Sequence, residues 1–183
     1  MNKPYASKWA IVDAARRMDE GMMHHCDLEW LYDQASKYDY VAEIGCWEGR
    51  TTAVLAAAGP KRVFAVDTWR GSSEVGDNTY GADRLQIMPA FLRNIDRFPN
   101  VIALMCDSNE ASLYLPDMDM VFIDANHTYE GVRMDILQWG PKTKQLLCGH
   151  DPYIPGVKKA VTELLGADCI NPAKGIWVKE ILL

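Results

Sequence analysis

Acidic and histidine side chains follow two apolar runs in the second half of the chain. Asp124 ends one run, His127 comes three residues later, and His150 and Asp151 end the next run. Because the carboxyl ends of adjacent parallel strands lie side by side, we expect these side chains to meet at one edge of a sheet. Two carboxylates and a histidine there could hold Mg²⁺, a hard cation that prefers oxygen ligands. The predicted metal ligands are Asp124, His150 and Asp151.

The same residues could carry acid–base chemistry. His127 is the best candidate for a general base, because an unperturbed imidazole titrates near neutral pH. A loop histidine that only hydrogen-bonds the backbone is the competing interpretation. The predicted catalytic residues are His127, Asp124 and His150.

A turn that contains glycine lies earlier in the chain, after a short apolar run. Gly45 and Gly49 stand four residues apart in this turn, and a second apolar run further along the chain ends at Asp67. Glycines after one strand and an acid at the tip of the next suit a ligand with an adenosine-like ribose. A tight strand–helix turn with solvated acids is the competing interpretation, and Asp67 could equally be a helix cap or turn acid.

The residues of this turn favour a cationic ligand over a dinucleotide. The turn lacks the middle glycine of the pattern Gly-x-Gly-x-x-Gly, and Cys46 and Trp47 would crowd a pyrophosphate. Glu43 also places negative charge near the ligand. S-adenosylmethionine has a ribose, a sulfonium and an ammonium group but no phosphate, so it fits these residues better.

Strand and helix patterns alternate from residue 40 onward, which favours an α/β fold with a doubly wound parallel sheet covered by helices on both faces. Two helices are expected before that, near 9–18 and 27–37, and we read His24-His25-Cys26-Asp27 as the start of the second. Predicted strands cover 40–45, 62–67, 100–105, 119–124, 145–149 and 175–181, and predicted helices cover 50–58, 83–97, 129–139 and 155–165. The irregular segment 68–82 is expected to be a lid or binding loop.

Size and composition predict one soluble domain over residues 1–183, with an N-terminal helical cap (1–38) and a core (39–183). The net charge is −6 and no Lys/Arg block is present, so nucleic acid is an unlikely partner. No apolar run approaches the length of a membrane span, and the start lacks the apolar core of a signal peptide. The five scattered cysteines are expected to be reduced thiols in the cytoplasm, and a homo-oligomer is left open.

Several motifs together carry a family resemblance over roughly residues 40–165. They are Glu43-Ile44-Gly45-Cys46-Trp47-Glu48-Gly49, Val66-Asp67-Thr68-Trp69, Cys106-Asp107-Ser108, residues 122–132, and Gly149-His150-Asp151. On these motifs the chain resembles class I S-adenosylmethionine-dependent methyltransferases. It looks closest to the branch of macrocin and related sugar O-methyltransferases and of proteins named for cephalosporin hydroxylase.

The resemblance implies a Rossmann-like, mostly parallel seven-stranded sheet whose last strand, near 175–181, runs antiparallel. It also implies that Glu43, Gly45 and Gly49 line the methionine end of the cofactor, Asp67 the ribose, and Asp107 with Ser108 the adenine. Asp-Ser is also an ordinary helix N-cap, which is the competing interpretation of that pair. The predicted cofactor-binding residues are Glu43, Gly45, Cys46, Trp47, Gly49, Thr51, Asp67, Thr68, Trp69, Asp107, Ser108 and Asp124.

The predicted function is methyl transfer from S-adenosylmethionine to an oxygen of a small-molecule acceptor, with Mg²⁺ as a candidate second cofactor. Trp69, Tyr80 and the N-terminal helices are expected to close over the acceptor. Two departures from the family pattern bear on the metal: His150 stands where some relatives have an acid, and Asn126 where many do. The alternatives are a Rossmann oxidoreductase of the NAD type, a non-catalytic protein that binds S-adenosylmethionine, and methyl transfer to nitrogen or carbon, since the fold does not fix the acceptor atom.

Overall fold

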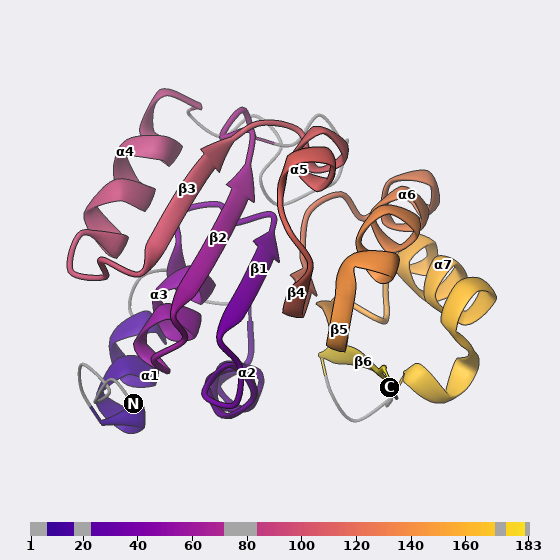
Figure 1. Ribbon diagram of the computed structural model, residues 1–183, viewed down its shortest axis with the longest axis horizontal. Helices are drawn as coiled ribbons and strands as arrows, with labels where there is room; N and C mark the ends of the chain where they lie inside the picture. The colour runs from indigo at the N-terminus through magenta and orange to yellow at the C-terminus, as the bar shows by residue number, and fades with distance from the viewer. Residues whose placement is uncertain (1–6, 17–22, 72–83, 171–174, 182–183) are drawn as a thin grey trace.

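A single mixed sheet forms the centre of the chain (Figure 1). The computed structural model describes residues 7–16, 23–71, 84–170 and 175–181. The strands are β1 (Tyr40–Ile44), β2 (Arg62–Asp67), β3 (Val101–Met105), β4 (Met118–Ile123), β5 (Thr143–His150) and β6 (Ile176–Glu180). Their order is β3-β2-β1-β4-β5-β6; β6 pairs antiparallel with β5, and the other pairs are parallel.

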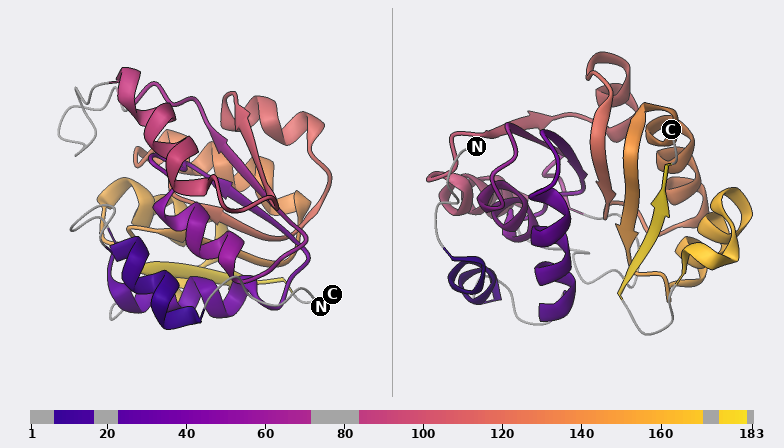
Figure 2. Two further views of the ribbon diagram at one scale, coloured as in Figure 1. Left: turned by 90° about the vertical axis from the view of Figure 1, so that its left-hand side faces the viewer. Right: turned by 60° about the horizontal axis from the view of Figure 1, so that its bottom comes forward.

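Helices cover both faces of this sheet (Figure 2). The helices are α1 (Lys8–Arg16), α2 (His25–Ala35), α3 (Arg50–Ala57), α4 (Arg84–Ile95), α5 (Ser108–Tyr114), α6 (Tyr129–Trp139) and α7 (Pro155–Leu165), with 3₁₀ turns η1 (Gly140–Lys142) and η2 (Ala167–Cys169). On one face α1 and α2 pack against α3, and on the other α6 packs between α5 and α7. The predicted α/β class and the antiparallel last strand are therefore confirmed.

Alternate residues of the strands supply the two halves of the core. On β1, Val41 joins the apolar cluster formed with α1, α2 and α3, whereas Ala42 and Ile44 join the cluster formed with α5, α6 and α7. This alternation follows from the pleat, which points successive side chains to opposite faces. Both faces of the inner strands are buried, so these strands are almost wholly apolar, as in other covered parallel sheets.

Seven strands were expected, but the described residues form a sheet of six. After β5 the chain forms α7 and η2, and Ile170 then makes an isolated antiparallel bridge with Trp177 of β6. Among the described residues this single bridge stands where a further strand beside β6 would form. Helix α5 was also not predicted, because its seven residues are too few to show a helical period.

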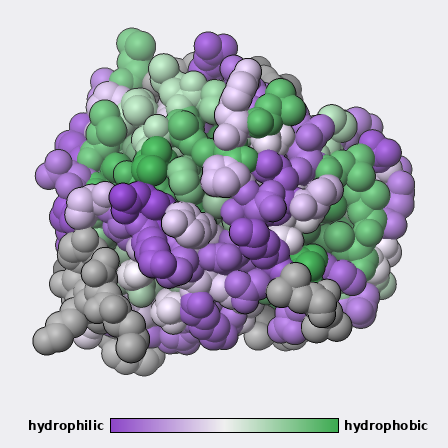
Figure 3. Space-filling view, viewed as in Figure 1, coloured by the Kyte–Doolittle hydropathy of each residue, from purple (hydrophilic) through white to green (hydrophobic). Residues whose placement is uncertain are grey.

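Apolar side chains reach the surface at the free edge of the sheet, over β3 (Figure 3). Met105 at the end of β3 is 70% exposed, and Leu113 and Tyr114 at the end of α5 are more exposed still. No described helix is long and apolar enough to cross a bilayer. The expected lid lies largely outside the described residues, which omit 72–83 and with them Tyr80.

Candidate active site

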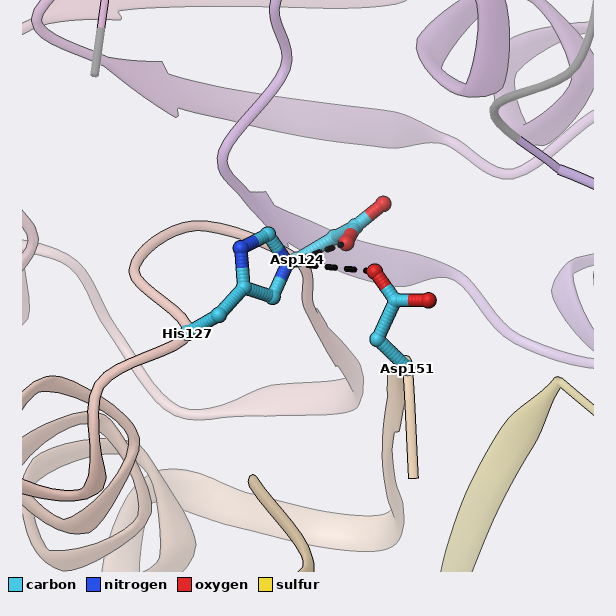
Figure 4. Close-up of side chains that lie close together, drawn as sticks. All are labelled: Asp124, His127 and Asp151. Carbon is cyan, nitrogen blue, oxygen red and sulfur yellow. Dashed lines mark ion pairs between the residues drawn. The ribbon is translucent and has the colours of Figure 1, made fainter. Parts of the chain in front are cut away.

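The carboxyl ends of β4 and β5 bring together three of the predicted site residues. The two strands pair in parallel with Ile123 opposite Gly149, so Asp124 and Asp151 follow side by side. Between them lies the imidazole of His127, from the β4–α6 loop (Figure 4). Its Nε2 is 3.6 Å from Asp124 Oδ1 and 3.3 Å from Asp151 Oδ2. The expectation that these side chains meet at one sheet edge is confirmed.

The histidine in this cluster differs from the one in the predicted metal set. Ligand atoms of Asp124, His127 and Asp151 all lie within 4.8 Å of one another. His150, which the prediction had in place of His127, is only 6% exposed and lies behind the carboxylates. Its Nδ1 is 3.7 Å from Asp124 Oδ1 and 3.4 Å from Asp151 Oδ1. Both histidines therefore lie beside the two carboxylates, and His127 joins the predicted ligands Asp124, His150 and Asp151 as a candidate.

The charges in this cluster determine which groups carry protons. Burial alone would lower the pKa of His127, but Asp124 and Asp151 beside it raise that pKa to about 10. Burial likewise opposes ionisation of Asp151, but His127 and His150 hold the pKa of its carboxyl well below its usual range. Without a further cation, His127 is therefore an imidazolium at neutral pH. The expectation that it titrates near neutrality is wrong for this arrangement.

Local hydrogen bonds hold the His127 loop in place. Asn126 Oδ1 accepts from the Thr128 backbone N–H at 2.8 Å and from the Thr128 hydroxyl at 2.5 Å. Thr128 in turn caps α6, its Oγ1 accepting from the Gly131 N–H at 3.1 Å. This pair of short-range turns is what Asn and Thr side chains favour before a helix. Asn126, which stands where many relatives have an acid, thus shapes the loop that presents His127.

Close packing explains why both positions in the β1–α3 turn are glycine. Gly45 has φ +86°, and a Cβ there would lie 2.2 Å from the Asp124 carbonyl oxygen and 2.6 Å from Ala125 Cα. Gly49 has φ +82°, and a Cβ there would lie 2.8 Å from the Phe91 ring. The turn therefore presses directly on the loop that carries the catalytic candidates, and only glycine permits this contact.

Asp67 serves as a turn acid. Its Oδ2 accepts from the backbone N–H groups of Cys46 at 2.8 Å and Trp47 at 2.9 Å, and its Oδ1 accepts from the Trp69 N–H at 2.7 Å. The carboxylate thereby ties the loops after β1 and β2 together. A carboxylate offers about four lone-pair sites, so these bonds leave it acceptor capacity for a ribose hydroxyl.

Several side chains predicted to bind the cofactor are buried in the protein instead. Cys46 is 4% exposed, and its thiol donates to the Glu43 carbonyl. Trp69 is 4% exposed, packs on Phe91 at a ring-centroid distance of 4.7 Å, and donates from Nε1 to the Trp47 carbonyl. Their side chains therefore stabilise the turn, and the expectation that Trp69 closes over an acceptor is wrong.

Glu43 is also buried, at 1% exposure, with its carboxyl accepting a short hydrogen bond from the Thr52 hydroxyl. Burial raises the pKa of Glu43 from 4.5 to about 8, against the opposing effect of the Thr52 bond. At neutral pH it is largely neutral, so the expected negative charge beside the ligand is absent. Glu43 is buried because β1 is covered on both faces. The sequence pattern alone does not show that this particular acid is enclosed.

This burial predicts a pH-dependent stability. The folded-state pKa exceeds the unfolded-state value, so the contribution of Glu43 is fully present below about pH 4.5 and is lost as the pH rises through about 8. We expect wild type to lose about 1–3 kcal/mol of unfolding free energy from this group between pH 5 and 8. Glu43→Gln should flatten that slope in urea titrations. A variant slope equal to that of wild type would show that Glu43 is ionised in the fold.

The competing N-cap interpretation holds for the Asp107-Ser108 pair. Asp107 caps α5, its Oδ1 accepting from the Asn109 N–H at 2.9 Å. The Ser108 hydroxyl donates to Asp135 at 2.5 Å and accepts from Trp139 Nε1 at 2.9 Å. The Ser108 hydroxyl thus has partners within the fold, whereas Asp107 stays exposed at the sheet edge, and the role of this pair at an adenine stays a prediction.

Other predicted residues have local partners. The Thr51 hydroxyl lies 4.0 Å from the Met23 sulfur, and the Thr68 hydroxyl accepts from the Arg70 N–H at 3.3 Å. His24 is the N-cap of α2, and His25 Nδ1 lies 2.6 Å from the Glu29 carboxylate within that helix. The interpretation of the His24–Asp27 run as a helix start is confirmed.

Backbone strain marks the same edge of the sheet. Among the described non-glycine residues, positive φ angles occur at Trp47 (46°), Trp69 (50°) and Asp151 (54°), which follow β1, β2 and β5. Such conformations cost roughly 1–3 kcal/mol each and cluster at functional sites. No pattern in the sequence predicts these positive φ angles, because the strain depends on how the loops pack.

Comparisons with known proteins agree with this geometry. A family model described as a methyltransferase domain matches residues 42–151. A candidate caffeoyl-CoA O-methyltransferase of Staphylococcus aureus aligns with a TM-score of 0.68 at 12% identity, over 96% of this chain and 92% of that one. No curated protein matches by sequence.

Two further solved structures show the same fold. An O-methyltransferase from Bacillus cereus, solved in complex with SAH, aligns with a TM-score of 0.64 at 16% identity, over 98% of this chain and 92% of that one. A candidate RNA methyltransferase of Pyrococcus horikoshii aligns with a TM-score of 0.60 at 12% identity, over 85% and 79% of the two chains. Sequence identities this low establish a similar fold only. The chemistry must therefore be argued from the residues of the site.

Proposed function

This chain belongs to the methyltransferase domain family, and on that premise we propose that it transfers a methyl group from S-adenosylmethionine to an oxygen of a small molecule. The observation that carries the proposal is the cluster of Asp124, His127 and Asp151 at the carboxyl edge of β4 and β5. This is the edge at which ligands bind in open α/β sheets. Structural neighbours that are O-methyltransferases, one of them solved with SAH, support the same reaction class.

The acceptor class follows from charge. The chain carries a net charge of −6, so an RNA acceptor is disfavoured although some structural neighbours are described as RNA methyltransferases. We propose a hydroxyl of a small molecule, with a sugar hydroxyl first because the motifs resemble the macrocin and sugar O-methyltransferase branch. We further propose that residues 1–183 form one domain, since α1 and α2 pack on α3 of the core.

The cofactor side of the site is assigned to the loops after β1, β2 and β3. Asp67 would accept from ribose hydroxyls, Asp107 from the adenine amine, and Trp47 would lie along the cofactor with the backbone of the Gly45–Gly49 turn. When bound, S-adenosylmethionine supplies the methyl group on a positively charged sulfur. A positive charge bound beside Asp124 would offset the two carboxylates and so would lower the pKa of His127.

The acceptor side of the site is assigned to His127. In its neutral form, Nε2 accepts the proton of the acceptor hydroxyl, and Asp124 with Asp151 then stabilises the imidazolium. Asp124, His127 and Asp151 also form a donor set that fits a divalent cation, which would supply Lewis-acid activation of the hydroxyl. Holding the hydroxyl and the methyl donor at close range supplies much of the rate.

A panel assay tests the reaction class. The purified chain is incubated with S-adenosylmethionine and separate pools of sugars, phenols, amines and RNA, with Mg²⁺ or with EDTA, and SAH release is followed. We expect release only with hydroxyl acceptors and a product methylated on oxygen. Release only with amines or RNA would contradict the proposed acceptor, and cofactor binding without release in any pool would favour a non-catalytic binding protein.

Replacing Asp107 separates its two roles. Asp107→Ala removes both the cap and the carboxylate, and should lower SAH affinity by about tenfold and unfolding free energy by about 1 kcal/mol. Asp107→Asn keeps an equally good cap, so its stability should match wild type while SAH affinity falls by about fivefold. Calorimetry and urea unfolding provide the two readouts. Unchanged affinity in both variants would make Asp107 a helix cap only.

A further inference from the structure

Asp27 is a buried acid that the proposed chemistry does not use. It lies in the first turn of α2 and is 2% exposed. Its Oδ2 has no hydrogen-bond partner among the described residues. Burying a carboxylate oxygen without a partner is costly, so such a group in a native fold calls for an explanation.

The space that Asp27 faces is shared with His150. A Cβ placed on Gly175 would lie 2.5 Å from Asp27 Oδ2 and 3.2 Å from His150 Nε2. Because both atoms approach one point so closely, they are less than about 6 Å apart. Gly175 is itself held at the site, since its carbonyl accepts from the Asp151 N–H at 3.0 Å. The missing side chain of Gly175 is therefore what lets Asp27 approach the imidazole.

The imidazole of His150 spans from this buried acid to the active-site carboxylates. Its Nδ1 faces Asp124 at 3.7 Å and Asp151 at 3.4 Å, while Nε2 is the nitrogen on the Asp27 side. The ring is 6% exposed, so water cannot readily replace these partners. Burial alone would lower the pKa of His150, but the bond with Asp151 and the charges of Asp124, Asp151 and Asp27 raise it.

We propose that Asp27 is a positioning residue of the active site: its buried carboxylate lies less than about 6 Å from His150 Nε2, without a direct hydrogen bond to it, and attracts the Nε2–H side of the ring so that Nδ1 faces Asp124 and Asp151. An imidazole with acids on both sides has one preferred orientation and therefore helps to hold the Asp124 and Asp151 carboxylates in turn. The N-terminal helix α2 would then be part of the catalytic machinery. The approach of Asp27 to His150 across Gly175 stands on geometry, and only its effect on rate rests on the proposed function.

Nitrogen-15 spectra of the imidazoles test directly whether Asp27 acts on the His150 ring. The chain has four histidines, and single His→Gln variants assign each ring in long-range proton–nitrogen correlation spectra. Asp27→Asn and Gly175→Ala should each move the Nε2 resonance of His150, while the resonances of His24 and His25 stay unchanged. Asp33→Asn, on an exposed turn of the same helix, is the matched control and should move none.

The spectra test the effect of Asp27 on His150 even if a variant has lost activity. Asp27→Asn is nearly isosteric, and Gly175→Ala disturbs the same contact from the opposite side. A folded Asp27→Asn protein with His150 resonances identical to those of wild type would overturn the proposal. This readout needs neither cofactor nor acceptor, so it stays informative if the chain turns out not to transfer methyl groups.

A double-mutant cycle tests the effect on rate, using the acceptor found in the panel. Asp27→Asn should lower kcat by about tenfold and leave the Kd for SAH within about twofold. In a His150→Gln background the same change should have no further effect on kcat, because the ring through which Asp27 acts is gone. Additive losses in the double variant would instead show an effect that bypasses His150, and would overturn the positioning role.

Discussion

His127→Gln is expected to lower kcat for methyl transfer by about 10²–10⁴-fold while the Kd for SAH stays within about threefold. His127 Nε2 lies 3.6 Å from Asp124 and 3.3 Å from Asp151, and its ring is more exposed than that of His150, the other histidine beside these carboxylates. Glutamine keeps a polar group of similar reach but cannot take up a proton. The loss should therefore fall on the chemical step, and initial rates with the acceptor from the panel would measure it.

The matched control is His25→Gln. His25 pairs with Glu29 near the start of α2, outside the cluster of carboxylates at the sheet edge, and its loss should leave kcat unchanged. Equal turnover in His127→Gln and wild type would remove His127 from the reaction. A large rise in the SAH Kd with unchanged kcat would instead move His127 to cofactor binding.

Gly45→Ala should lower the free energy of unfolding by about 2–5 kcal/mol. The added methyl group would lie 2.2 Å from the Asp124 carbonyl oxygen, and the φ of +86° is unfavourable for any residue with a Cβ. Neither contact is the flexible end of a side chain, since both the Asp124 carbonyl and Ala125 Cα belong to the backbone. Relief would require the β4–α6 loop to move, so activity should fall as well. Urea unfolding measures the first effect and initial rates the second.

Gly140→Ala is the control for the loss of a glycine as such. Its added Cβ would meet only Leu147 Cδ2, at an ordinary contact distance of 3.8 Å, and its φ is −54°. Helical conformation is compatible with alanine, so the free energy of unfolding should change by less than about 1 kcal/mol. Equal losses in the two variants would show that the close packing at Gly45 is not the cause.

Hydrophobic patterning was enough to predict most of the sheet. The strands β1, β2 and β4 lie within a residue or two of their predicted ranges, because short, mostly apolar runs like these fit strands that are buried on both faces. The antiparallel β6 was implied by the family resemblance. The number of strands was not predictable, because it depends on how the chain returns after α7, and that return has no local signal.

The sequence predicted the positions of site residues that directly follow strands. It did not predict properties that depend on packing, such as burial and protonation. Asp124 and Asp151 meet because strand topology dictates it. The protonation of His127 and the burial of Glu43 depend on groups brought in from other elements, so residue type alone was misleading. Asp27 was overlooked for the same reason: an acid in the first turn of a helix is usually solvated.

Calorimetric titration of the purified chain with SAH is the measurement closest to the central claim. The account predicts saturable one-to-one binding at micromolar concentrations, with NADH giving no heat of binding under the same conditions. Weaker binding in Asp107→Ala should accompany it. Absence of binding by both SAH and S-adenosylmethionine up to high micromolar concentration would contradict the claim that this chain is an S-adenosylmethionine-dependent methyltransferase.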